Sequence, residues 1–423
     1  MSKKLEKYNH LNILLHIFKM IKTLCENIKL FFEKKNSTFG NELYNTVKSV
    51  TSNFSKNLSF FYLKDKIDNS FLDYMVFQYC IHNKNTFVIT VWPVTYDAED
   101  IFLNNYNKYG SIIYKKEIRL QGDGFKNMLH FISDKKKHPR GMDLWFAAPH
   151  RHKNPLTIYI FETKEMVNIS TNQKINYLTN IFNNNRHHVL QIHAKGGLNN
   201  LYVTTCAKRE CRNEIIKQQK IAPISFAPDK QYSHHVNDEH YETIELCRIF
   251  LNDNTLNLIQ LFKFNELEKF EIKFNSFLRF LIKHNICLND ILIYNSGVLA
   301  PFGLREPGDI DFVQGGNKLI PQRYLPKDID IQNKYFRRGY MVLATNHKSQ
   351  YMEDNQNFMI RENIDSKKFI WKLSLDDIIY NPKYYFYYRN IKFMTPKLFE
   401  KVKKIRNRPK DIAQLPFLKY IVT

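Results

Sequence analysis

Two aspartates separated by one residue, Asp309 and Asp311, are the side chains in this sequence best suited to chemistry. They lie in the run Asp309-Ile310-Asp311-Phe312-Val313, whose apolar residues predict a β-strand. Alternate side chains of a strand point to the same side, so we expect both carboxylates on one face and Ile310 and Phe312 in a core. Two carboxylates on one face repel each other unless a cation lies between them, and their oxygens suit Mg²⁺. The pair therefore predicts a magnesium site.

A turn of small residues, Asn295-Ser296-Gly297, precedes this pair. The apolar residues 291–294 before it predict a short strand, and residues 298–304 after it predict the start of a helix. Such a turn lets backbone N–H groups approach a triphosphate near a helix N-terminus, so we expect Ser296 and Gly297 to contact phosphate. A metal and a phosphate cradle together suit in-line nucleotidyl or phosphoryl transfer. The alternative is that Asp309 and Asp311 form an ordinary polar strand edge after a Pro-Gly turn.

The turn and the acidic pair together resemble the DNA-polymerase-β-like nucleotidyltransferase superfamily, which has a Gly-Ser turn followed by Asp-x-Asp on the next strand. The stretch 296–312 also resembles the phosphocholine-transferase-type branch, which works on surface glycans. This resemblance implies that Arg305 contacts the triphosphate or the acceptor. The chain departs from the family pattern because Asn295 precedes Ser296 and glycine follows it.

The same resemblance implies a third carboxylate from a later strand. Asp330, in Asp328-Ile329-Asp330-Ile331, is the first candidate by its strand alternation, and Asp354 and Asp365 stay open as alternatives. Without a third acid, metal or nucleotide binding could survive while catalysis could not be assumed. The predicted catalytic set is therefore Asp309, Asp311 and Asp330.

The C-terminal tail carries an aromatic run at 384–388, then Lys392, then a basic helix predicted over 398–408 and Lys410. Similar tails occur in proteins with this transferase fold. We expect the aromatic residues to pack in the core, although they could stack on a base or sugar. Most of the lysines suit a solvated face, and only Lys392 and Lys410 are kept as candidate nucleotide-phosphate contacts.

The middle of the chain alternates predicted strands (86–92, 111–120, 157–161) with predicted helices (97–109, 126–133, 239–251), and residues 215–220 form a further short element. This order resembles nucleoside diphosphate kinases, which have a ferredoxin-like core. The segment His235-Val236-Asn237-Asp238 resembles the catalytic histidine segment of that family. The resemblance implies a phosphohistidine at His235 with Asp238 beside it.

Three departures weaken this second resemblance, which covers residues 83–252. Trp92 stands where the family places a lysine, and Val236 stands where it places a glycine. Arg212 could bind phosphate, but it lies too far from His235 in the sequence. A degenerate, non-catalytic relative fits these departures better than a working kinase.

The whole chain has 423 residues and a formal net charge of +22, with 63 Lys and Arg against 41 Asp and Glu. Such a charge favours polyanionic partners, namely nucleotides, nucleic acid or an anionic membrane surface, although codon bias toward lysine explains it equally well. The six cysteines show no zinc-binding spacing and suit reduced thiols in a cytoplasm. Neither a signal peptide nor a membrane-spanning run is evident. We therefore expect a cytoplasmic protein.

Residues 10–33 have apolar positions at helical spacing with lysines between them. Such a helix packs on the protein body or lies on an anionic membrane as a peripheral contact, and we favour the first. The predicted organisation is a basic helical N-terminal arm (1–82), a degenerate kinase-like domain (83–265) and a nucleotidyltransferase-like domain (266–423). The fold class is α+β, with a ferredoxin-like middle domain and a mixed α/β C-terminal domain.

These expectations support two classes of function. The first is an Mg²⁺-dependent nucleotidyl- or phosphoryl-transferase that takes a nucleoside triphosphate and acts on a sugar or surface-polysaccharide precursor. The second is a non-catalytic nucleotide- or nucleic-acid-binding protein, which the absence of a specific nucleic-acid-binding motif makes the weaker alternative.

Overall fold

The structure is a computed structural model of the full chain. It describes residues 69–120, 124, 155–218, 234–261, 267–315, 320, 322–331, 340–341, 360–364, 367–371, 373–406, 408–419 and 421. The described residues fall into two compact units that meet in the sequence between Leu251 and Asn252. Each unit is described by itself.

The first unit contains one four-stranded sheet with helices on both faces. Its elements are, in chain order, α4 (Asn69–His82), β1 (Thr86–Val91), η1 (Pro93–Ala98), α5 (Glu99–Tyr106), β2 (Gly110–Ile118), β3 (Leu156–Thr163), α8 (Thr171–Ile181), α9 (Arg186–Ala194), α10 (Leu198–Lys217), β4 (His234–Val236) and α11 (His240–Phe250). The strand order is β2-β3-β1-β4, and every neighbouring pair is antiparallel. From β1 to β4 the chain therefore runs strand, helix, two strands, helices, strand.

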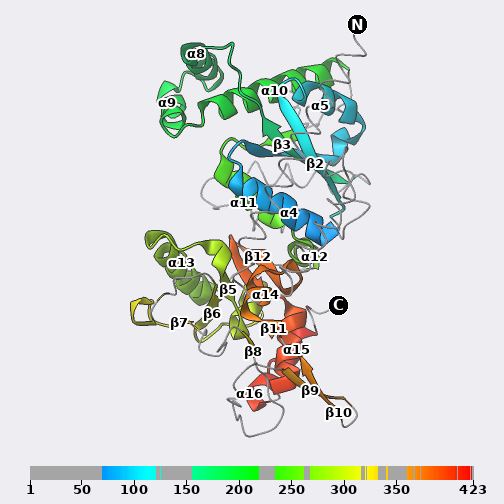
Figure 1. The fold of residues 1–423 in the computed structure, drawn as a ribbon, viewed down its shortest axis with the longest axis vertical. Coiled ribbons are helices and arrows are strands. Elements are labelled where there is room, and N and C mark those ends of the chain that lie inside the picture. The colour runs from blue at the N-terminus through cyan, green and yellow to red at the C-terminus, as the bar shows by residue number, and fades with distance from the viewer. Residues whose placement is uncertain are drawn as a thin grey trace, which may run out of the picture. The chain divides into compact units, whose positions relative to one another are not determined.

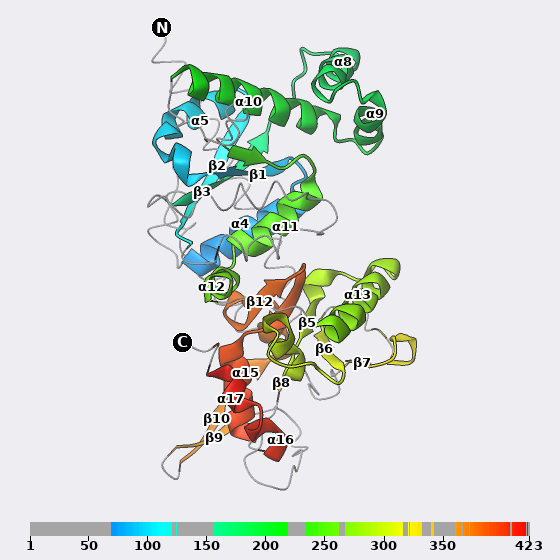
Figure 2. The same ribbon diagram turned by 180° about the vertical axis from the view of Figure 1, so that it is seen from behind.

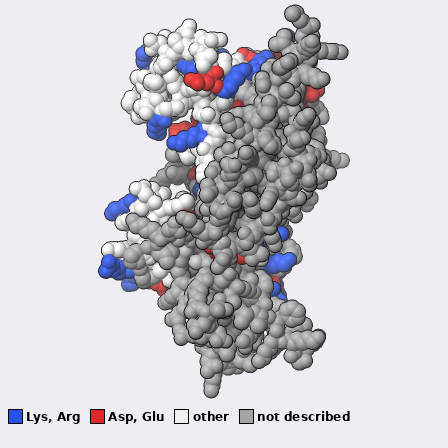
Figure 3. All heavy atoms as spheres, viewed as in Figure 1, with Lys and Arg blue, Asp and Glu red and all other residues white. Residues whose placement is uncertain are grey.

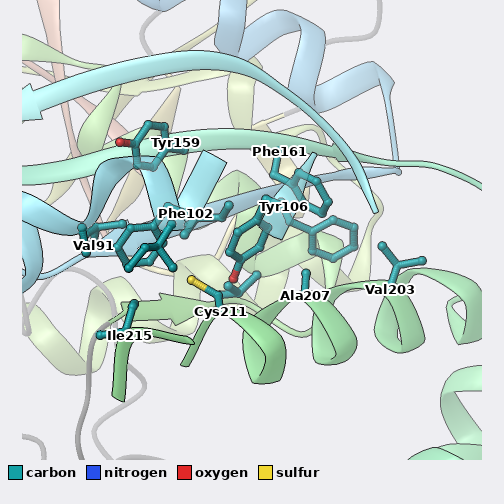
Figure 4. Close-up of a cluster of buried hydrophobic side chains, with 14 residues drawn as sticks. Val91, Phe102, Tyr106, Tyr159, Phe161, Val203, Ala207, Cys211 and Ile215 are labelled. Carbon is teal, nitrogen blue, oxygen red and sulfur yellow. The ribbon is translucent and has the colours of Figure 1, made fainter. Parts of the chain in front are cut away.

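Four helices of the first unit cover the sheet, whose strands β1 and β3 are almost wholly buried. Figure 1 and the reverse view in Figure 2 show α5 and α10 on one face and α4 and α11 on the other. Figure 4 shows the first of these faces, where Tyr106 of α5 and Phe161 of β3 pack above Ala207 and Cys211 of α10. Small side chains on α10 let this long helix approach the aromatic rings closely.

The second unit contains a five-stranded sheet and two small ladders. Its elements are α12 (Asp253–Leu261), α13 (Glu268–Lys283), η3 (Leu288–Asp290), β5 (Ile291–Ile293), η4 (Asn295–Phe302), β6 (Ile310–Gln314), η5 (Gln322–Tyr324), β7 (Ile329–Ile331), β8 (Tyr340–Met341), β9 (Ile360–Ile364), β10 (Lys367–Trp371), β11 (Leu373–Ser374), α14 (Leu375–Tyr380), η8 (Pro382–Tyr384), β12 (Tyr385–Tyr388), β13 (Ile391–Met394), α15 (Pro396–Arg406), α16 (Pro409–Ile412) and α17 (Leu415–Leu418).

The five-stranded sheet has the order β12-β13-β5-β6-β7. The pairs β12–β13 and β5–β6 are antiparallel, whereas β13–β5 and β6–β7 are parallel. Helix α13 packs an aromatic face on this sheet, with the ring of Phe277 4.9 Å from that of Phe312 and Phe274 5.7 Å from Phe393. The sheet is thus mixed, and β6 lies between an antiparallel and a parallel neighbour.

The α+β class is confirmed, and several boundaries differ from the expected ones. Helix α4, expected within the N-terminal arm, packs against α11 in the first unit, and residues 215–217 are the end of α10 rather than a separate element. Helix α12 belongs to the second unit, because the side chain of Asn254 donates to the backbone oxygens of Pro382 and Tyr385. The division therefore precedes the expected one at residue 265. The helices expected over 10–33 and 126–133 lie outside the described residues.

Candidate active site

Three carboxylates meet where β6 and β7 lie side by side. One ligand oxygen from each of Asp309, Asp311 and Asp330 lies within 4.8 Å of the other two. Asp311 and Asp330 are direct partners in the parallel β6–β7 ladder, and Asp309 immediately precedes β6. In the described part of the chain, no other group of three His, Cys, Asp or Glu side chains comes this close together. Strand alternation thus brought together the three acids proposed from the sequence.

The backbone around the acidic triad is fixed on both sides. The Ile310 N–H donates to the Asp328 carbonyl at 2.9 Å, and the Tyr294 N–H donates to the Asp311 carbonyl at 3.0 Å. From α13, the Lys273 ammonium donates to the Gly308 carbonyl at 2.5 Å and lies 3.7 Å from the Asp328 carboxylate. One lysine therefore holds both segments that lead into the acid-bearing strands, and it places a positive charge on the segments that flank the triad.

Asn295 makes a contact that the sequence reasoning did not find. Its side-chain Nδ2 donates to Oδ2 of Asp311 at 3.0 Å. Asn295 has a φ of +55°, the left-handed conformation that glycine adopts most readily. The Asn-Ser-Gly order had indicated only a departure from a Gly-Ser pattern. No local pattern in the sequence indicates this contact, because it joins residues sixteen positions apart.

Ser296 and Gly297 lie in the first turn of η4, a 3-10 helix over Asn295–Phe302 rather than an α-helix starting at 298. Ser296 is half-buried and Gly297 is buried. A Cβ on Gly297 would lie 2.8 Å from Cγ2 of Ile293, so the glycine allows the turn to pack closely on β5. The structure therefore gives Gly297 a packing role and leaves Ser296 as the more accessible of the two candidate phosphate contacts.

Lys392 was expected to contact phosphate, and its surroundings argue against that role. Its ammonium donates to the backbone oxygens of Asn289 at 2.6 Å and Ile379 at 2.7 Å. It also lies 4.6 Å from the ring centre of Tyr385 and 5.1 Å from that of Tyr380. With only 2% of the residue exposed, Lys392 is a buried cation that ties α14 and the turn before β5 to the inner strand β13.

The other two basic candidates, Arg305 and Lys410, are exposed. Arg305 lies in the loop between η4 and β6, four residues before Asp309 in the sequence. Lys410 lies in α16 beside Asp411, whose carboxylate is fully buried and bonds to Lys403 at 2.8 Å and to Arg408 at 2.6 Å. Burial raises the pKa of Asp411, but its bonds to Arg408 and Lys403 outweigh this and leave the pKa below its usual value. Asp411 thus stabilises the tail.

The aromatic run of the tail packs in the core, as the preferred interpretation expected. Tyr385, Phe386, Tyr387 and Tyr388 form strand β12 and are all buried. The Phe386 ring stacks on Phe393 of β13 at 5.6 Å. These rings are therefore occupied within the sheet rather than presented to a base or sugar.

In the first unit, His235 lies on β4, half-buried and paired with Thr90 of β1. Its neighbour His234 is fully buried, and burial, with the nearby Arg212 cation, holds its pKa well below the usual value of 6.5. Burial raises the pKa of Asp238, while Lys208 and His188 act in the opposite direction. The phosphohistidine role expected at His235 stays a prediction.

The described residues drawn in Figure 3 do not gather their positive charge into one stripe. Lys and Arg side chains of the described residues lie there in separate groups, with Asp and Glu side chains next to several of them.

Among the described residues, Cys80, Cys206, Cys211 and Cys247 are buried free thiols and Cys287 is an exposed one. No helix in the described ranges is long and apolar enough to cross a membrane. Asp354 and Asp365 lie outside these ranges.

Comparisons with family models, with curated proteins and with solved structures give no significant match.

Proposed function

We propose that this chain is an Mg²⁺-dependent nucleotidyl- or phosphoryl-transferase whose reaction centre is the acidic triad. The observation that carries the proposal is the approach of Asp309, Asp311 and Asp330 to within 4.8 Å of one another across the β6–β7 pair. Three carboxylates so close together repel strongly unless a cation offsets their charge. We propose accordingly that the second unit has a nucleotidyltransferase-like fold and the first a ferredoxin-like one.

The chemistry of the three side chains fits magnesium. All three offer carboxylate oxygens, with no imidazole or thiolate among them, and Mg²⁺ prefers hard oxygen ligands while keeping waters and substrate phosphates in its shell. Bound there, Mg²⁺ would supply a positive charge for the triphosphate oxygens and for the charge that develops during transfer. Asp309 and Asp311 would hold it.

The protein's own residues would then position the two reactants. Ser296, which is half-buried and follows Asn295 in the sequence, would contact the triphosphate, and the exposed Arg305 would approach its phosphates or the acceptor. Asp330 lies on β7, the last strand of the five-stranded sheet, and would accept the proton of an acceptor hydroxyl. That hydroxyl oxygen bonds to phosphorus as the bond to the leaving group breaks, which is the nucleoside diphosphate in phosphoryl transfer and pyrophosphate in nucleotidyl transfer. The sequence resemblance points to a sugar or surface-polysaccharide precursor as the acceptor.

The test is a double variant, Asp309→Asn with Asp311→Asn. Mg²⁺-dependent turnover of nucleoside triphosphates, measured as nucleoside-diphosphate or pyrophosphate release with sugar acceptors present, should fall at least about 100-fold, as removal of one electrostatic transition-state contact alone costs that much. The charge-matched control is Asp100→Asn with Asp253→Asn, two exposed carboxylates in the first turns of α5 and α12. Full turnover in the first double variant would refute the proposal.

A second candidate function, nucleotide or nucleic-acid binding without turnover, is favoured by the first unit. Lys208 and Arg212 lie one turn apart on α10, close enough to Asp238 and His234 to affect their pKa values. Binding of bulk RNA or DNA through such charges should weaken steeply as salt rises, because counterions are released. Salt-insensitive binding of a single nucleotide would instead point to a pocket, and a protein that binds neither nucleic acid nor nucleotide would remove this alternative.

A further inference from the structure

Asn295 combines two properties that no ordinary turn residue needs together. Its backbone is left-handed, with a φ of +55°, and its side-chain amide bonds to Oδ2 of Asp311 at 3.0 Å. Left-handed backbone is costly for most residues and free for glycine, with asparagine among the few others that tolerate it. Glycine would satisfy the backbone but could not reach Asp311. The turn therefore accounts for the backbone of Asn295 but not for its side-chain bond to Asp311.

The same short segment also holds the backbone of Asp311. The Tyr294 N–H donates to the Asp311 carbonyl at 3.0 Å. The next residue, Asn295, donates to the Asp311 side chain. Two adjacent residues at the end of β5 thus fix one aspartate at both its carbonyl and its carboxylate. Asp311 is also 91% buried, so its orientation depends on protein contacts more than on solvent.

We propose that Asn295 is a positioning residue that orients the Asp311 carboxylate for the cation, an inference that rests on the proposed function. An amide N–H can only donate, so it binds one carboxylate oxygen and sets the rotation of the group about its terminal bond. The other oxygen is thereby presented in one direction. The donated bond also lowers the repulsion among the three acids while no cation is present. Hydrogen-bond partners of metal ligands typically contribute in this way.

The cleanest test is Asn295→Gly, which removes the amide while keeping a backbone that adopts positive φ freely. Binding of Mn²⁺, which takes the same oxygen ligands as Mg²⁺, is measured by isothermal titration calorimetry. We expect the dissociation constant to rise about 10- to 100-fold, as for other partners of metal ligands. The matched control is Asn285→Gly, because Asn285 has a φ of +53° in the exposed turn after α13. Its affinity should stay within about twofold of the wild-type value.

A second variant covers the case in which Asn295→Gly folds poorly. Asn295→Asp has the same shape but replaces the donor with a fourth acid. We expect it to unfold at a lower temperature than the wild type in EDTA, and to gain more than the wild type from Mn²⁺. Equal gains in the two proteins would contradict a role at the cation. A purely structural role for Asn295 would lower the unfolding temperature of Asn295→Gly without changing its Mn²⁺ affinity.

Mn²⁺ binding distinguishes the positioning role of Asn295 from the metal site of the acidic triad itself. If the wild type binds Mn²⁺, the Asp309→Asn with Asp311→Asn variant does not, and Asn295→Gly binds as the wild type does, the positioning role of Asn295 is wrong and the metal site stands. If the wild type and the Asp309→Asn with Asp311→Asn variant show the same Mn²⁺ binding, both inferences fail.

Discussion

Two buried carboxylates of the second unit differ in what surrounds them. Asp411 has two cations within bonding distance, Lys403 and Arg408, whereas Asp311 has two further carboxylates near it and one neutral amide. The charge of the Asp411 carboxylate is thus offset by cations of the protein itself. Around Asp311, three carboxylates lie within 4.8 Å of one another, an arrangement that a bound cation would stabilise. The comparison teaches that burial of an acid is compatible with either stability or binding, and that the charge of its immediate partners tells which.

The largest expected effect is on stability at Asp411. Asp411→Asn leaves the Lys403 side chain, 3% exposed, without its opposite charge, and breaking a buried ion pair in this way costs about 3–5 kcal/mol. The free energy of unfolding from urea titration measures this. Glu400→Gln, which removes the partner of the mostly exposed Lys404, should cost less than about 0.5 kcal/mol. Equal losses in the two variants would contradict the comparison.

Removing carboxylates from the acidic triad should not lower the stability of the metal-free protein, in contrast to the substitution at Asp411. Without divalent cations, Asp309→Asn with Asp311→Asn should leave the protein at least as stable as the wild type, because it removes repulsion between acids. With Mg²⁺ at 100 times its dissociation constant, the wild type should gain about 2.7 kcal/mol and the double variant nothing. Thermal unfolding with and without Mg²⁺ decides. A double variant that is markedly less stable in EDTA would place the triad with Asp411 as a structural feature.

Lys392 and Lys410, both expected from the sequence to contact phosphate, should differ in what they contribute to stability. Lys392→Met leaves the backbone oxygens of Asn289 and Ile379 without their buried donor, which should cost about 1–3 kcal/mol. Lys410→Ala, at an exposed position, should change stability by less than about 0.5 kcal/mol. Chemical unfolding of both variants tests this. If Lys392→Met weakened nucleotide binding without loss of stability, its structural assignment would be wrong.

The smallest effect concerns His234 in the first unit. Because its folded pKa lies below 6.5, the unfolded chain takes up the proton first, so its contribution to stability is complete above pH 6.5 and decreases as the pH falls toward the folded pKa. One such group adds at most about 1.4 kcal/mol per pH unit. His234→Phe should remove this slope between pH 5 and 6.5, measured by unfolding at several pH values. The exposed His193→Gln should keep it.

The acidic triad was accessible from the sequence because it depends on the simplest rule of strands. A period of two places Asp309 and Asp311 on one side, and the same rule applied to Asp328-Ile329-Asp330-Ile331 selects Asp330. The parallel register that pairs Asp311 with Asp330 then follows from burying Ile310, Phe312 and Ile329. Local periodicity was enough here, since both strands are short and adjacent.

Other features depend on contacts that no local pattern encodes. Lys392 lies in a strand that is buried on both faces, so its alternation with Ile391 and Phe393 could not indicate an exposed side. Helix α10 was missed except for its end, because its buried positions include Thr204, Cys206 and Ala207, which give a weak apolar pattern. The left-handed turn at Asn295 likewise gains its meaning only from Asp311, sixteen residues away.

The burial of Lys392 also determines how this protein would respond to amine-reactive reagents. Acylation requires a neutral amine that can leave its contacts and meet the reagent, and the Lys392 ammonium is held by two carbonyl oxygens between two aromatic rings. Exposed lysines such as Lys410 would be modified at once, whereas Lys392 would be modified only when β13 separates from its neighbours. The rate at which Lys392 is labelled therefore measures how often the five-stranded sheet opens.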